Sequence, residues 1–211
     1  SLPPDFNKFI WCSIFFGSSF TISYNSNGAT AGSAPADGAF TTGVSFSTST
    51  NSGNLIKSGY TFTGWNTSAA GTGTSYGENS ALTTTANMTL YAKWTIISPL
   101  ITFNQGSAIT TPSIFPANTS AQYGSLYTLP ATDTSTVISS VTQVFTGWSD
   151  GANTYAVGDT YRIGTTNVTF TAQWVAVYTV RYVLNGGSGT VPADILRTNS
   201  FAETLTSATV T

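Results

Sequence analysis

The sequence predicts a mainly β protein built from tandem repeat modules, two of them complete and one partial. The clearest sign is a self-match, because residues 59–94 and 143–174 share F-T-G-W, a later Tyr, N-x-T and a final A-x-W. Apolar and hydroxyl side chains also alternate in segments such as FTISY, a period typical of strands. Finally, only 7% of residues are charged and 13% are aromatic, which favours half-buried strands over long helices.

Each module is expected to open with an alternating strand followed by a tight turn. Tyr24, Phe103 and Tyr182 recur at an equal spacing of 79 residues (24 to 103 to 182), which sets the repeat period. An Asn-Gly pair at 27–28 and a Gly-Gly pair at 186–187 favour positive φ and therefore turns. We expect four or five strands per module, with 46–56 and 126–140 as connections holding at most one helical turn.

The repeat period divides the chain into four parts. Residues 1–19 form an apolar N-terminal tail or donor strand, 20–96 repeat 1, 97–175 repeat 2 and 176–211 a partial repeat 3. The segment FIWCSIFF at 9–16 is too short for a membrane helix, so no membrane-spanning segment is expected. Its flanks do not fit a secretion signal, and it is interpreted as an apolar strand.

The composition excludes several classes of function. The chain has no His, which removes Ser-His and Cys-His catalysis and His-ligated zinc. The net charge of −2 and the six scattered cations argue against nucleic acid as a partner. The lone Cys12 cannot form an internal disulfide. We therefore expect a protein that is not an enzyme, with no catalytic residues, no cofactor and no metal site.

The order of these motifs resembles the Listeria/Bacteroides repeat, also called the internalin-type B repeat, of bacterial surface proteins. The residues that carry it are a strand, an N-G or G-G turn, P-A, G-Y-x-F-x-G-W, Y-x-x-G and N-M/V-T-L/F-x-A-x-W, over residues 20–211. The resemblance implies small β-grasp-like modules in tandem on secreted or cell-surface chains, generally without catalytic activity. The second unit departs from it with VTQVFTGW where GY usually stands, and the third unit lacks a G-W half.

The repeated tryptophans allow two interpretations. Trp65, Trp94, Trp148 and Trp174 are expected in the structural core, because each follows a glycine or lies on an alternating strand. The alternative is a set of stacking platforms for sugars. Tyr91 and Tyr123 are better candidates for exposed contacts.

The few charged residues near turns also have two interpretations. Asp150 and Asp159 could form a carboxylate pair for glycoside hydrolysis or calcium binding, but Asp150-Gly151 is itself a turn signature, and the turn is preferred. Lys57 and Lys93 could form an intramolecular isopeptide bond, although no spacing supports it over a solvated lysine.

The two ends of the chain suggest self-association. Repeat 3 lacks the strands that would cover its apolar face, and the N-terminal strand belongs to no complete repeat. We expect the N-terminal strand of one subunit to complete repeat 3 of the next, giving a filament. The alternative is a fragment of a longer array. The expected subunit-interface residues are Phe6, Phe9, Trp11, Ile14, Phe16, Tyr178, Val180, Tyr182, Leu205 and Val210.

Two functions therefore stay open at the level of the sequence. The first is a structural stalk or self-assembling filament subunit outside the cell or on a bacterial surface, whose main partner is a second copy of itself. The second is an adhesin module that binds a glycan or a host protein through exposed aromatics.

Overall fold

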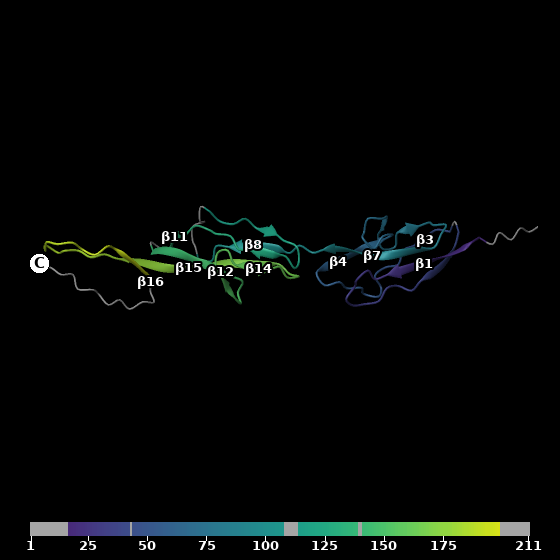
Figure 1. Ribbon diagram of the computed structural model, residues 1–211, viewed down its shortest axis with the longest axis horizontal. Coiled ribbons are helices and arrows are strands. Elements are labelled where there is room, and N and C mark those ends of the chain that lie inside the picture. The colour runs from purple at the N-terminus through teal and green to yellow at the C-terminus, as the bar shows by residue number, and fades with distance from the viewer. Residues whose placement is uncertain (1–16, 43, 108–113, 139–140, 199–211) are drawn as a thin grey trace, which may run out of the picture. The chain divides into compact units, whose positions relative to one another are not determined.

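The computed structural model describes residues 17–42, 44–107, 114–138 and 141–198, and these residues form strands and turns with no helix (Figure 1). The prediction of a mainly β fold is confirmed. The chain divides into two compact units, Ser1–Ile96 and Ile97–Thr211, here unit 1 and unit 2. The strands of unit 1 are β1 (Ser19–Asn25), β2 (Gly38–Thr41), β3 (Phe46–Ser47), β4 (Tyr60–Asn66), β5 (Ser75–Tyr76), β6 (Ala81–Leu82) and β7 (Met88–Ile96). Those of unit 2 are β8 (Leu100–Asn104), β9 (Thr119–Ser120), β10 (Leu126–Thr128), β11 (Ser135–Ile138), β12 (Val141–Ser149), β13 (Thr154–Tyr155), β14 (Thr160–Arg162), β15 (Val168–Val180) and β16 (Ile195–Thr198).

Both units arrange their strands in the same way. The sheet of unit 1 has the order β2-β1-β7-β4-β5, with β1 and β7 parallel and the other pairs antiparallel. In unit 2, β9, β8, β15, β12 and β13 take the same places, and β11 adds a further strand beside β12. A separate two-stranded ladder accompanies each sheet, β3 with β6 and β10 with β14. The internal repeat in the sequence is therefore a repeat of topology.

The connecting stretches differ from the expectation. Residues 46–56 and 126–140 contain the short strands β3, β10 and β11 among their described residues, and no helical turn. Aromatic packing gives a physical reason: the Phe46 ring stacks on Phe40 with centroids 4.0 Å apart, and Tyr127 packs on the core of unit 2. These stretches are part of each module's interior.

The asparagine of the N-x-T motif ties the last strand of each unit to the first. Asn87 Oδ1 accepts a hydrogen bond from Thr21 N, and Asn167 Oδ1 accepts one from Leu100 N, each at 2.8 Å. This side chain satisfies a backbone donor where the parallel pairing begins. The motif thus fixes the start of the central strand pair in both units.

The F-T-G-W motif builds a β-bulge, at which the pairing register of β4 with β7 and of β12 with β15 shifts. The glycines there have φ of 112° (Gly64) and 145° (Gly147). A Cβ on Gly147 would lie 2.2 Å from Tyr155 O, so the close approach of backbone requires glycine. The Thr146 hydroxyl donates to Gln173 O at 3.2 Å across the bulge, as Thr63 does to Lys93 O.

Each unit has its own hydrophobic core, centred on the Trp of that motif. Trp65 and Trp148 are fully buried, and each contacts the ring of a Phe three residues earlier, edge to face. The same tryptophans meet the ring of the first strand, Tyr24 or Phe103. The buried core residues are Phe20, Ile22, Leu55, Trp65, Leu82, Leu90 and Ala92 in unit 1 and Ile101, Phe103, Leu129, Trp148, Ile163, Phe170 and Ala172 in unit 2.

One strand crosses the expected boundary between repeats 2 and 3, at residues 175 and 176. Strand β15 runs without interruption from Val168 to Val180, because its residues up to Ala176 pair with β12 and its last four pair with β16. The β15–β16 hairpin reproduces the first hairpin of unit 1. Val180 pairs with Ile195 where Ile22 pairs with Gly38.

Candidate functional site

The four repeated tryptophans fall into two pairs. Trp65 and Trp148 are fully buried, and their indole N–H groups donate to Ser49 O at 2.7 Å and Pro130 O at 2.9 Å. Trp94 and Trp174 are half-buried and pack on the two cores, with Nε1 donating to Asn27 O or Gln105 O. The first pair offers no ring to a ligand, whereas the second pair borders a groove in each unit.

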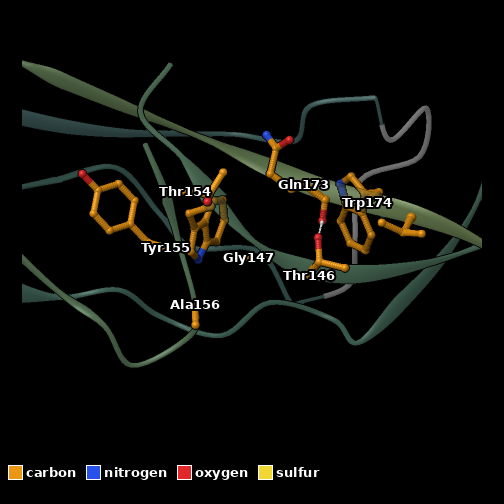
Figure 2. A pocket seen from close by; sticks show the side chains of 9 residues that line it. Thr146, Gly147, Thr154, Tyr155, Ala156, Gln173 and Trp174 are labelled. Carbon is orange, nitrogen blue, oxygen red and sulfur yellow. Dashed lines mark hydrogen bonds between the residues drawn. The ribbon is translucent and has the colours of Figure 1, made fainter. Parts of the chain in front are cut away.

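The groove of unit 2 has a volume of about 420 Å³ and lies beside the glycine bulge (Figure 2). Trp174 and Gln173 lie on one side of it, and the short strand with Thr154 and Tyr155 lies on the other. Most of its polar groups already have partners, since Thr146 Oγ1 donates to Gln173 O and Gln173 Nε2 donates to Thr171 O. The groove is uncharged.

The groove of unit 1 has a volume of about 310 Å³ and contains two lysines. It is lined by Lys57, Lys93, Tyr60 and Trp94 together with Asn27, Ala69, Ala70, Gly71 and Ala92. Lys57 Nζ lies 4.8 Å from the centroid of the Tyr60 ring, a cation–π contact, and Lys93 Nζ donates to Ser75 Oγ at 2.8 Å. These contacts involve no carboxylate or amide side chain, as an isopeptide bond would require. Sequence reasoning missed this groove, because its two lysines are far apart in the chain.

The two aspartates near the β12–β13 turn hold the backbone of that turn. Asp150 Oδ1 accepts from Ala152 N at 2.9 Å and Asn153 N at 2.7 Å, and its Oδ2 accepts from the Tyr155 hydroxyl at 2.8 Å. These bonds, led by the one from Asn153, lower the pKa of the Asp150 carboxyl. Asp159 Oδ2 accepts from Ala156 N at 2.8 Å. Within the described residues no group of three or more His, Cys, Asp or Glu could hold a metal ion.

In unit 1 the residue after F-T-G-W is the buried Asn66, where unit 2 has Ser149. Asn66 is 1% exposed, and its side chain binds the loop between β4 and β5 through five hydrogen bonds, to Ser68 N, Gly71 O, Gly73 N, Gly73 O and Ser75 Oγ. The hairpin of unit 1 closes the loop 67–74 with the pair Asn66–Ser75, whereas that of unit 2 closes the shorter loop 150–153 with the pair Ser149–Thr154. Sequence reasoning did not identify the Asn66 side chain as the group that binds the longer loop.

The expected subunit-interface residues fall into two groups. Tyr178 is 44% exposed, and Val180 and Tyr182 are half-buried at the end of β15 and just beyond it. Their neighbours Val183 and Leu196 are 76% and 64% exposed, so this end of unit 2 presents apolar side chains to solvent. The others lie outside the described residues: Phe6, Phe9, Trp11, Ile14, Phe16, Leu205 and Val210.

The two tyrosines expected to make exposed contacts are less exposed than Tyr60 and Tyr178. Tyr91 and Tyr123 are half-buried, whereas Tyr60 and Tyr178 are exposed. In the described residues no helix is long and apolar enough to cross a membrane.

The family model of the Listeria-Bacteroides repeat domain matches residues 20–93. Unit 1 carries a Listeria-Bacteroides repeat. The resemblance inferred from the motifs is confirmed for this unit. The motifs correspond to the β-bulge, to the Asn87 side chain that binds Thr21 N, and to the Phe62 ring that contacts both Trp65 and Trp94.

Two further comparisons concern longer parts of the chain. A protein of Evansella cellulosilytica named "Putative Gly-rich membrane protein" is 34% identical over 184 residues, which cover 80% of this chain and 20% of that protein. The chain thus spans about a fifth of the length of this curated relative. Among solved structures, Streptococcal High Identity Repeats in Tandem (SHIRT) domains 3-4 from a cell surface protein are similar over 74% of this chain and 98% of theirs, at 16% identity and a TM-score of 0.28.

Proposed function

We propose that the chain is a non-enzymatic structural repeat protein, outside the cell or on a bacterial surface, that serves as a stalk or filament subunit. The observation that carries this proposal is that the two units have equivalent hydrophobic cores. Both units bury an equivalent Trp under an equivalent ring, with a separate core in each. Modules that are complete in themselves suit a spacer, because their number can change without loss of stability. The Listeria-Bacteroides repeat in unit 1 and the curated relative named as a membrane protein support a place at the cell surface.

The proposal includes a β-grasp-like arrangement of each module. Its support is the central pair of strands, in which the first strand of the unit lies parallel to the last, β1 with β7 and β8 with β15. Such a pair brings the beginning and the end of a module together in the middle of its sheet.

The finer part of the proposal is assembly by strand addition at repeat 3. In unit 1, Ile22–Asn25 pair in parallel with Met88–Tyr91. The repeat period aligns Tyr24 with Tyr182, so the matching segment is 180–183. Among the described residues this segment pairs only with β16, at Val180, and the strand ends there. Tyr178 is 44% exposed where its counterpart Phe20 is 3% exposed. An additional parallel strand would cover these side chains.

The donor that we propose is residues 1–16 of a second copy, the most apolar and aromatic stretch of the sequence. Each subunit has one donor strand and one acceptor edge. Donation in one direction therefore joins subunits head to tail, and the product is a filament. Deletion of residues 1–16 is expected to abolish fibres seen by electron microscopy at a concentration where the whole chain forms them. Fibres that persist without these residues would contradict the proposal.

Adhesion is the second candidate function, favoured by the exposure of Tyr60 and Tyr178. Aromatic rings of this kind bind sugars and protein surfaces through their faces. A glycan array and a cell-adhesion assay on the chain lacking residues 1–16 separate the two candidates, since a pure spacer binds nothing in either.

A further inference from the structure

The groove of unit 1 is lined by two lysines, and none of its described lining residues is a carboxylate. Lys57 and Lys93 account for two of the six cationic side chains in the sequence. Both are half-buried, and their contacts are a tyrosine ring and a serine hydroxyl. A half-buried ammonium group without a counterion interacts more strongly with an added anion than a fully solvated one does. The charge is therefore available to a ligand.

The walls of the groove are rigid and leave space beside the charges. Asn27 Nδ2 donates to Ala69 O and Ala92 O, both at 2.9 Å, so one side chain fastens the 69–71 loop to strand β7. Ala69, Ala70 and Gly71 project almost nothing into the space. Trp94, held by its N–H to Asn27 O, lines the groove with Tyr60. Aromatic rings beside small residues suit the apolar face of a sugar ring.

Unit 2 provides an internal comparison. Its sequence has Gln173 in place of Lys93, Ser140 in place of Lys57 and Gln143 in place of Tyr60. The half-buried Trp and the bulge remain, but both charges are gone. The fold of the repeat therefore does not need the lysines. Their presence together in one groove of unit 1 calls for an explanation other than folding.

We propose that this groove binds an acidic saccharide, with Lys57 and Lys93 supplying positive charge for its carboxylate or phosphate and the Trp94 and Tyr60 rings lining the space for its sugar. Lys93 and Lys57 supply the charge, Asn27 Oδ1 is a candidate acceptor for a sugar hydroxyl, and the small residues of the 69–71 loop leave room for the ring. The inference rests on the second candidate function, surface recognition, and is independent of strand addition.

The test is titration of the full-length chain with a galacturonic acid trisaccharide, a sugar phosphate and a neutral galactose trisaccharide, followed by calorimetry. We expect one or both acidic ligands to bind at least about tenfold more tightly than the neutral one, and the better acidic ligand identifies the natural anion. The K57Q/K93Q variant should lose about tenfold in affinity. The matched control R162Q/R197Q removes two charges from unit 2 and should bind as the unchanged chain does.

Amide chemical-shift mapping on the unchanged chain makes the test independent of how the variants fold. Shifts at Gly28, Gly71 and Lys93 support the site, and shifts confined to other residues contradict it. Equal affinity for the neutral sugar, equal loss in the control, or no binding at about 10 mM ligand would each overturn the proposal. Cell adhesion that survives in K57Q/K93Q would refute this site while leaving the adhesion candidate standing.

Discussion

At the scale of single residues, the glycine before each core tryptophan is a position that other residues cannot occupy without strain. Gly147 combines a φ of 145° with a neighbouring carbonyl oxygen 2.2 Å from where a Cβ would lie. The Gly147→Ala variant should therefore lower the free energy of unfolding by about 1–3 kcal/mol, since strained backbone alone costs that much. Urea unfolding followed by circular dichroism measures the loss.

A matched glycine in the same unit provides the control. A Cβ on Gly164 would meet nothing within 4 Å, and its φ is outside the positive range. Gly164→Ala should change the unfolding free energy by no more than about 0.5 kcal/mol. Equal stability of the two variants would show that the bulge does not require glycine at position 147.

Asp150 gives the turn of unit 2 a dependence on pH. Its pKa is lowered, first by the hydrogen bond from Asn153 N, so the folded state favours the charged carboxylate. The stabilisation is complete above the pKa of the unfolded chain, about 4, and is lost as the pH falls through the lower pKa of the folded state. Asp150→Asn should remove this part of the acid sensitivity, as measured by unfolding midpoints across the acid range.

The tyrosine bonded to Asp150 reports the same interaction at high pH. The pKa of Tyr155 is raised, mainly by burial and then by the hydrogen bond to Asp150. In Asp150→Asn this pKa should move back toward about 10 in a titration of ultraviolet absorbance. Asp37→Asn makes the same change of charge in unit 1 and should leave the Tyr155 titration unchanged. An unshifted Tyr155 in Asp150→Asn would contradict the assignment.

At the scale of elements, sequence reasoning succeeded where a pattern had a period. The alternation in FTISY and the recurring A-x-W predicted strands that the structure contains as β1, β7 and β15. The ladders β3–β6 and β10–β14 were missed because strands of two or three residues are too short to show alternation. The parallel pairing of β1 with β7 was also beyond prediction, since it joins segments more than sixty positions apart.

The same limit applies to the candidate site. The core role of a tryptophan could be inferred from its neighbours, as in Gly64-Trp65. The groove of unit 1 could not be inferred from the sequence, because Lys57 and Lys93 line one groove only after β4 and β7 have paired. The sequence shows which charged residues are present, whereas the pairing of strands determines which of them lie on the same surface.

At the scale of the whole molecule, the low charge of the sequence has a structural meaning. Because only 7% of residues are charged, electrostatic repulsion between copies of the chain is weak. Unpaired strand edges also have few charged side chains that would oppose pairing with another chain. An ion pair of Arg181 with Asp194, at 3.1 Å, joins the two sides of the connection between β15 and β16. The edge that we propose for assembly begins beside it, at Val180.

A backbone change at that edge separates assembly from folding. Tyr182 lies beyond the last β15–β16 pair, Val180 with Ile195, so Tyr182→Pro removes an N–H of the open edge without removing one from the hairpin. We expect this variant to stay monomeric in analytical ultracentrifugation where the unchanged chain forms filaments. Tyr182→Ser removes the same ring but keeps the N–H, so it should weaken assembly less than Tyr182→Pro does. Filaments of normal yield from Tyr182→Pro would show that growth does not pass through this edge, whatever the N-terminal segment contributes.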